Sequence, residues 1–319
     1  MADHTEIARA TAAGTVVMIC GPTAAGKSGL ALALAEETGG VIINADSMQL
    51  YRDLRVLTAR PGETEMARAP HRLYGVMDGA ERASVASWLA MAAEAVAAAR
   101  QDSALPIIVG GTGLYFHAAI HGIAPIPDVP KDIHAECVQQ LAKQGGTAFR
   151  ATLAGLDPVT ADRLHDGDSQ RLVRAMGVAR ATGRPISDWQ AEPHHGAIGC
   201  LPLRIVMMPP RDELYHAIDR RFETMMTDGA TDEVAALSAR GLDPSLPVMK
   251  AIGVREIMAM LAGEIAPELA VEQASRDTRR YAKRQMTWIR NNFNTEFTLS
   301  EKQTERNIQK IFAILSKSG

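Results

Sequence analysis

The stretch TVVMICGPTAAGKS, residues 15–28, joins a short apolar run to a glycine-rich turn. Thr15–Cys20 is rich in β-branched residues, which is typical of a strand buried in a parallel sheet. Residues 21–28 match G-x-x-x-x-G-K-[ST] at every fixed position, and helical periodicity starts at Lys27. In such a strand–turn–helix unit, the N–H groups of the turn and the positive end of the helix face one anion. We therefore predict a phosphate site formed by Gly21, Pro22, Thr23, Ala24, Ala25, Gly26, Lys27 and Ser28.

The side chains of Lys27 and Ser28 would bind different parts of a phosphate complex. Lys27 would place a positive charge on the terminal phosphate, and the hydroxyl of Ser28 would bind Mg²⁺. The alternative is a chance glycine turn, but the position of the motif between a strand and a helix favours the phosphate loop. The motif predicts phosphate binding without identifying the phosphorylated compound.

Apolar runs and helical segments alternate after this loop. Further strands are predicted at 41–43, 106–109 and 203–208, and helices at 27–37 and 84–101. In the C-terminal part, helices are expected at 211–227, 230–240, 250–262, 267–292 and 303–317. The alternation predicts an α/β fold with a P-loop NTPase-like parallel sheet core.

A helical segment interrupts this core. Pro125, Pro127 and Pro130 mark a break, and residues 131–190 show helical segments and turns without a convincing strand. We predict a core domain built from residues 1–124 and 200–319, and a helical insertion domain formed by residues 125–199.

The composition excludes several classes of protein. The chain of 319 residues has a formal net charge of −3, so any contact with nucleic acid requires a local basic patch. Three cysteines without a C-x-x-C pair argue against a disulfide framework or a zinc site. The start of the chain does not look like a secretory signal, and no run of residues is apolar enough to span a bilayer. We expect a cytoplasmic protein that works as a monomer.

An acidic residue follows the second predicted strand, in NADSMQLY at 44–51. Because the carboxyl ends of parallel strands meet at one edge, Asp46 and Thr112 should flank the phosphate loop. A carboxylate beside a bound anion is costly unless it binds a metal or accepts a proton. The alternative is that Asp46 only caps a turn.

The C-terminal part contains a local concentration of positive charge. Residues 276–290, RDTRRYAKRQMTWIR, hold six basic residues against one acid, although the whole chain is acidic. Such a helix suits polyphosphate or an RNA backbone, and the alternative is a solvated helix packed through its apolar residues. A second, weaker basic pair is Arg171 and Arg174, which share one helical face.

Five strings together resemble those of the bacterial tRNA dimethylallyltransferase family. They are GPTAAGKS at 21–28, NADSMQLYR at 44–52, VGGTGLY at 109–115, DSQRLVRA at 168–175 and RRYAKRQMTWIRN at 279–291. All five occur in the family's order, and the resemblance covers residues 15–315. It implies transfer of the dimethylallyl group from dimethylallyl diphosphate to N6 of the adenine that follows the anticodon, in tRNAs reading codons that begin with U. It also implies a helical insertion, Mg²⁺ as the metal and tRNA as the partner.

The resemblance further implies roles for individual residues. Asp46 would be the general base, Arg221 a cation for the diphosphate, and residues 21–28 the diphosphate site, with Ser28 at the metal. The residues implied to contact tRNA are Asp46, Ser47, Met48, Gln49, Thr112, Gln170, Arg171, Leu172, Val173, Arg174, Lys283 and Arg284.

Two other readings of the motifs stay open. A P-loop kinase for a small metabolite would share the phosphate loop and would consume ATP. An RNA-binding P-loop protein without transfer chemistry would keep the basic helix and would not need Asp46.

Overall fold

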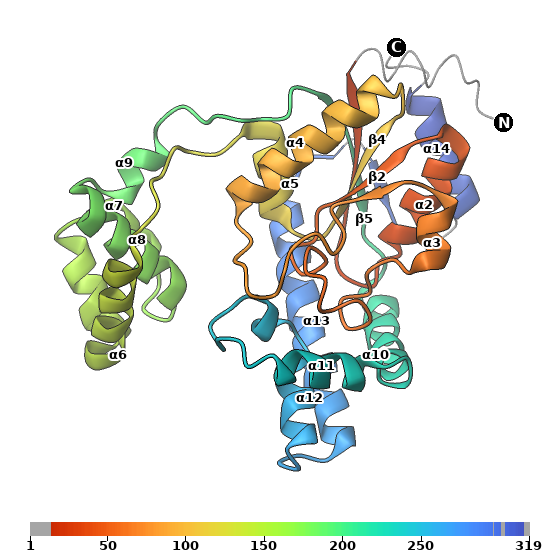
Figure 1. The fold of residues 1–319 in the computed structure, drawn as a ribbon. Coiled ribbons are helices and arrows are strands. Elements are labelled where there is room, and N and C mark those ends of the chain that lie inside the picture. Colours follow the sequence, from red (N-terminus) through yellow and green to blue (C-terminus); the bar gives the residue numbers. More distant parts are fainter. Residues whose placement is uncertain (1–13, 296, 301–303, 316–319) are drawn as a thin grey trace. The chain divides into compact units, whose positions relative to one another are not determined.

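A parallel six-stranded sheet forms the centre of the protein in this computed structural model, which describes residues 14–295, 297–300 and 304–315 (Figure 1). The strands are β1 (Thr15–Cys20), β2 (Val41–Asn44), β3 (His71–Arg72), β4 (Pro106–Gly110), β5 (Leu201–Met207) and β6 (Phe297–Leu299). Their spatial order is β3-β2-β4-β1-β5-β6, and all neighbouring pairs are parallel. The predicted α/β class is confirmed.

Helices cover both faces of this sheet. Figure 1 shows α4 (Val85–Gln101) and α5 (Gly113–His121) on one face, and α2 (Lys27–Thr38), α3 (Glu63–Arg68) and α14 (Thr304–Leu315) on the other. Every residue of β1, β2 and β4 is buried, as expected for strands covered on both sides. The sheet therefore holds the carboxyl ends of β1, β2 and β4 side by side in a rigid frame.

Helices that follow β5 lie below the sheet in the view of Figure 1, and the last of them, α13 (Pro267–Asn292), runs upward beside it. They are α10 (Arg211–Thr227), α11 (Ala230–Ala239), the 3₁₀ turn η1 (Val248–Lys250), α12 (Val254–Leu261) and α13. The predicted helix at 250–262 is wrong in its first part. Gly253 adopts φ 96°, a left-handed conformation that separates η1 from α12. Of the last predicted helix, residues 303, 316 and 317 lie outside the described residues.

The contacts divide the chain into two units, which we call the core unit and the insertion unit. The core unit is Met1–Ile120 with Ile198–Gly319, and the insertion unit is His121–Ala197, compared with 125–199 predicted from the prolines. The insertion unit contains α6 (Lys131–Ala154), α7 (Pro158–Arg163), α8 (Ser169–Thr182) and α9 (Ile186–Gln190). It has its own apolar centre around Phe149, Leu153 and Met176. Its described residues form helices and one isolated β-bridge, Ile123 to His195.

The structure bears on membrane-spanning helices and on the state of the cysteines. No helix in the described ranges is long and apolar enough to cross a membrane. Cys20, Cys137 and Cys200 are free thiols, the first two of them buried.

Candidate active site

The phosphate loop connects β1 to α2 and contains two residues with positive φ, one of them a glycine and the other an alanine. Gly26 has φ 90°, and Ala24 has φ 64°, so two residues of the loop are left-handed. Gly21 lies so close to β5 that an added Cβ would be 2.6 Å from the carbonyl oxygen of Met207. The loop is thereby wrapped tightly at the ends of β1 and β5, with the first turn of α2 directly behind it.

Lys27 is the cation of this loop. Its ammonium donates a hydrogen bond to the carbonyl oxygen of Pro22 at 2.7 Å, inside the loop itself. Burial lowers the pKa of Lys27 to about 8, and the negative charge of Asp46 partly opposes this shift. A bound anion would stabilise the charged form of Lys27, because its negative charge offsets the cost of burying the ammonium.

Asp46 stands on the segment that follows β2, and Asn44 holds that segment in place. The fully buried Asn44 donates to the carbonyl oxygens of Asp46 and Leu73 at 2.9 and 3.0 Å, and accepts from the N–H of Asp46 at 2.8 Å. The carboxylate of Asp46 accepts from the N–H of Met48 at 3.0 Å. A turn-capping role for Asp46 is therefore present in the structure, but the same carboxylate also faces a cavity.

Glycines at the end of β4 and in the turn that follows it allow close contacts with the segment after β2 and with α13. A Cβ at Gly110 would lie 2.1 Å from the carbonyl oxygen of Ala45, and one at Gly113 would lie 2.2 Å from the ring of Trp288. Thr112 lies in this turn, where its hydroxyl accepts from the N–H of Ser47 at 3.1 Å. The glycines of VGGTG thus allow the ends of β2 and β4 and helix α13 to meet.

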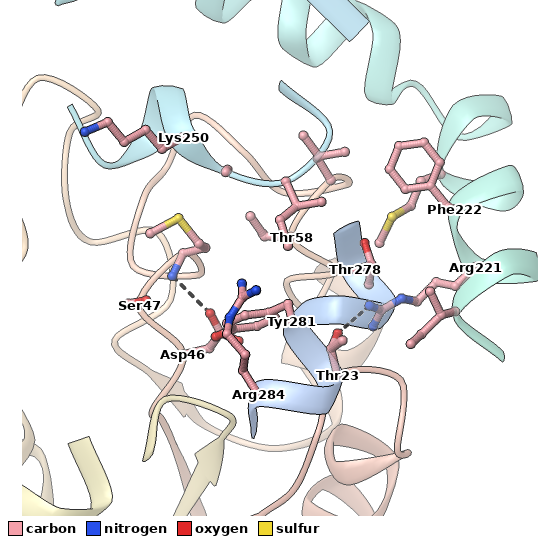
Figure 2. A pocket seen from close by; sticks show the side chains of 16 residues that line it. Thr23, Asp46, Ser47, Thr58, Arg221, Phe222, Lys250, Thr278, Tyr281 and Arg284 are labelled. Atoms are coloured by element: carbon pink, nitrogen blue, oxygen red, sulfur yellow. Dashed lines mark hydrogen bonds between the residues drawn. The ribbon is translucent and has the colours of Figure 1, made fainter. Parts of the chain in front are cut away.

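Arg221 approaches the phosphate loop from α10. Its guanidinium donates to the hydroxyl of Thr23 at 2.5 Å, as the dashed line in Figure 2 shows. Burial lowers the pKa of Arg221, and the charge of Asp46 opposes that shift. The structure therefore places Thr23, Asp46 and Arg221 around one space, although they are far apart in the sequence.

Two adjoining cavities share this space. The first has about 290 Å³ and the second about 320 Å³, and both are lined by Thr23, Asp46, Thr58 and Arg221. The second cavity also contains Lys27 and Ser28 of the phosphate loop. The first has a largely apolar wall that includes Leu57, Ile218, Met225 and Ile252. Phe222, which is labelled in Figure 2, belongs to the same wall. Together the two cavities suit a molecule with an anionic head and a small apolar group.

The basic helix predicted from the sequence is α13, and its cations have different environments. Arg279 forms an ion pair with Asp219, and Arg280 pairs with Asp277 at 3.0 Å. Arg284 is exposed, lines the first cavity, and lies 5.6 Å above the ring of Tyr281. Lys283 is exposed on the same helix. Burial raises the pKa of Tyr281, and the charge of Asp46 adds to this effect.

Gln285 of α13 is a site residue that sequence reasoning missed. It is 6% exposed, and its amide accepts from the N–H of Thr23 at 2.8 Å and donates to the carbonyl oxygen of Gly111 at 2.9 Å. The AKRQMTWIR string contained this residue, but its role depends on contacts across more than 170 positions of the chain.

Gln49 binds a neighbouring segment of the backbone and also lines a cavity. Its side-chain amide donates to the carbonyl oxygens of Thr58 and Ala59 at 2.9 and 3.0 Å. Gln49 lines the second cavity, whereas Ser47 and Met48 line the first. The residues 46–49 are thus spread over both cavities.

Residues 170–174 belong to the insertion unit, on α8. Gln170 and Arg171 are exposed, and Arg174 donates to the carbonyl oxygen of Pro127 at 3.1 Å. Leu172 and Val173 are 0% and 4% exposed, because they pack in the apolar centre of this unit. The predicted tRNA contact of these two residues stays a prediction, and it would have to come from their backbone atoms, because their side chains are buried.

The residues suit Mg²⁺ only as part of a phosphate complex. Among the described residues, no group of three or more His, Cys, Asp or Glu could hold a metal. Mg²⁺ usually keeps several waters and takes oxygens from substrate phosphates, so one protein hydroxyl is enough for a phosphate loop. Ser28 is exposed, lines the second cavity and supplies such a hydroxyl.

Comparisons with known proteins give the family of this chain. The family described as IPP transferase matches residues 49–292. A "tRNA dimethylallyltransferase" of Rhodospirillum rubrum is 52% identical over 287 residues, which are 90% of this chain and 88% of the relative. One of Paramagnetospirillum magneticum is 49% identical over 93% of this chain and 94% of the relative.

Solved structures give the same result. A tRNA isopentenylpyrophosphate transferase from Bacillus halodurans is 31% identical, with a TM-score of 0.69 over 95% of this chain and 96% of its own. A eukaryotic dimethylallyltransferase acting on tRNA is 23% identical with a TM-score of 0.79, and it supports the fold. The family predicted from the five sequence strings is confirmed: this chain belongs to the IPP transferase family.

Proposed function

We propose that this protein transfers the dimethylallyl group from dimethylallyl diphosphate to N6 of the adenine 3′-adjacent to the anticodon, in tRNAs that read codons beginning with U. The observation that carries this proposal is the pair of cavities that share Thr23, Asp46 and Arg221. The phosphate loop lines one cavity and apolar side chains line the other, so that a diphosphate and a five-carbon isoprenoid can lie next to each other. The names of the relatives support the same reaction.

The diphosphate is the leaving group of this reaction. When the bond between C1 of the allyl group and the diphosphate oxygen breaks, the electron pair stays on that oxygen. The N–H groups of residues 21–28, the ammonium of Lys27 and the guanidinium of Arg221 would stabilise the resulting charge. Mg²⁺, held through the hydroxyl of Ser28, would supply further positive charge to the diphosphate when it is bound.

The nucleophile is the exocyclic amine of adenine, which must leave its base stack to reach C1. A base in a tRNA loop is cheaper to extract than a paired one, at a cost of a few kcal/mol. Asp46 would accept the proton that N6 loses as the new C–N bond forms. The extracted base would lie beside Ser47, Met48 and Arg284, because these residues line the cavity that Asp46 faces. Thr112 would lie near it as well, because its hydroxyl binds the N–H of Ser47.

The insertion unit and α13 would hold the rest of the tRNA. The exposed side chains of Gln170, Arg171, Lys283 and Arg284 are of the type that binds phosphate oxygens and loop bases. Within the insertion unit, Arg174 would support the exposed face of α8 through its bond to Pro127. We expect the reaction to take place in the cytoplasm, because tRNA is the expected substrate. We also expect a monomer, which light scattering would test.

One assay tests the function against its two rivals. Unmodified tRNA, radiolabelled dimethylallyl diphosphate and Mg²⁺ are incubated with the protein, and label in tRNA is counted. Incorporation at the adenine beside the anticodon supports the transferase. ATP consumption with a small acceptor would support a kinase, and tRNA binding without incorporation would support an RNA-binding protein.

A further inference from the structure

Glu233 of α11 makes an unusual contact with a segment that lies 176 to 178 positions earlier in the chain. Its carboxylate accepts hydrogen bonds from three consecutive backbone N–H groups, those of Arg55, Val56 and Leu57, the last two at 3.0 and 2.9 Å. Hydrogen bonds to an ionised acceptor are roughly twice as strong as those between neutral groups. One side chain therefore fixes the backbone of this segment.

The segment, residues 54–60, forms a turn that we call the Thr58 loop. The N–H groups of Ala59 and Arg60 donate to the carbonyl oxygens of Val56 and Arg55 at 2.9 Å each. As in the first turn of a helix, the leading N–H groups of such a turn have no partner within it. Glu233 supplies that partner from another element, with a negative charge at the positive end of the turn.

The Thr58 loop forms one wall of both cavities. Leu57 and Thr58 line the first cavity, while Thr58 and Ala59 line the second beside the phosphate loop. Gln49 holds the other end of the loop through the carbonyl oxygens of Thr58 and Ala59. Glu233 therefore binds the backbone of the first part of the loop and Gln49 binds the backbone of the last part. Leu57, Thr58 and Ala59, which line the cavities, are held by these backbone bonds.

Helix α11 is itself anchored to this part of the chain. Arg240, which follows the last residue of α11, pairs with the buried carboxylate of Asp53 and with Asp78 at 2.6 Å. Two contacts therefore join α11 to the residues around the Thr58 loop, one through Glu233 and one through Arg240. Because the helix is fixed in this way, the Glu233 carboxylate can hold its partners in one geometry.

We propose that Glu233 is a positioning residue for the prenyl donor: its carboxylate holds the Thr58 loop in the shape that closes the two cavities around dimethylallyl diphosphate. This inference rests on the proposed function. It predicts that the loss of the carboxylate weakens donor binding and leaves tRNA binding unchanged.

The test compares Glu233→Gln with Asp232→Asn in the transfer assay. Glutamine keeps one accepting oxygen and replaces the other by an N–H₂ group, which cannot accept from a backbone N–H. Asp232 is the preceding, exposed residue of α11, so its change removes the same charge without touching the loop. For Glu233→Gln we expect the KM for dimethylallyl diphosphate to rise by about tenfold, since charge-assisted bonds are lost. We expect kcat and the Kd for tRNA to stay within about twofold, and Asp232→Asn to match the wild type.

Hydrogen exchange gives a readout that does not depend on turnover. The amides of residues 55–57 should exchange faster in Glu233→Gln than in the wild type, while those of β1 and β4 should not change. An unchanged donor KM, or equal losses in donor and tRNA binding, would overturn the inference in a protein whose wild type is active. An inactive wild type would instead contradict the proposed function, and the exchange at 55–57 would still report whether Glu233 holds the loop.

Discussion

The side chain of Gln285 accepts a hydrogen bond from the N–H of Thr23 at 2.8 Å, so helix α13 holds the phosphate loop directly. The same amide donates to the carbonyl oxygen of Gly111 at the end of β4. The contact is so close that a Cβ at Gly111 would lie 2.2 Å from the Gln285 nitrogen. One buried side chain thus joins the anion-binding loop, the neighbouring strand end and the helix that carries the exposed cations Lys283 and Arg284.

Replacing Gln285 by alanine should impair both stability and donor binding. The change leaves the half-buried N–H of Thr23 and the buried carbonyl of Gly111 without their partner. A buried group left unsatisfied costs about 1–3 kcal/mol. We expect the free energy of unfolding to fall by about 2 kcal/mol or more, as measured by urea denaturation. The KM for dimethylallyl diphosphate should rise as well, because Thr23 belongs to the phosphate loop.

The matched control is Gln273→Ala, on the same helix and only partly buried. It removes the same atoms without reaching the phosphate loop, and should leave the donor KM unchanged. If Gln285→Ala and Gln273→Ala lose equal stability and bind the donor equally well, Gln285 has no special part in holding the loop.

Replacing Asp46 by asparagine should slow turnover strongly while keeping the site intact. Asparagine retains an oxygen that can accept from the N–H of Met48, so the turn after β2 should persist. It cannot take up the proton from N6, and we expect kcat to fall by about 10²-fold or more. Filter binding should give a Kd for tRNA within about twofold of the wild type. A full rate in this variant would remove Asp46 from the proton transfer.

Lys283 provides a test of the basic helix that is independent of the chemistry. Its side chain is exposed on α13, and Lys283→Ala should weaken tRNA binding through the loss of a phosphate contact. The slope of log K against log salt should decrease in magnitude by about 0.7–0.9. Lys310→Ala removes the same charge from an exposed position on α14 and should change neither quantity. Equal salt slopes for wild type and Lys283→Ala would place the tRNA elsewhere.

The parts of the site that are local in sequence could be predicted. The phosphate loop depends on a strand, eight residues and a helix that follow one another, so one motif contains all the information. The placement of Asp46 and Thr112 near this loop followed from the rule that parallel strands end at one edge of a sheet. The bond between the Thr112 hydroxyl and the N–H of Ser47 agrees with that rule.

The remaining parts depend on contacts between distant segments. Gln285 and Glu233 are an amide and a carboxylate on helices, and nothing near them in sequence distinguishes them from solvent-exposed residues. The short edge strands β3 and β6 have two and three residues, too few to show a periodicity. The break before α12 depends on Gly253, whose left-handed conformation packs against Leu57 and Phe222 in the folded protein. Tertiary packing therefore sets the features that the sequence pattern leaves open.

The pKa of Lys27 gives the site a pH dependence with a definite sign. Burial lowers this pKa to about 8, so in the free protein the ammonium is charged below that pH and becomes neutral above it. Bound diphosphate favours the charged form and raises the pKa, so binding takes up a proton when the pH exceeds the free-state value. The terminal phosphate of the donor is ionised above about pH 7, since its last pKa is near 6. From about pH 7 to 8 the affinity for dimethylallyl diphosphate should therefore be flat, and above about pH 8 it should fall by at most about tenfold per pH unit. Calorimetry with the donor alone measures this without turnover. Lys27→Arg is the control, because a guanidinium stays protonated throughout this range and should give no such fall. A wild-type affinity that does not change up to about pH 10 would mean that the Lys27 ammonium does not bind the diphosphate.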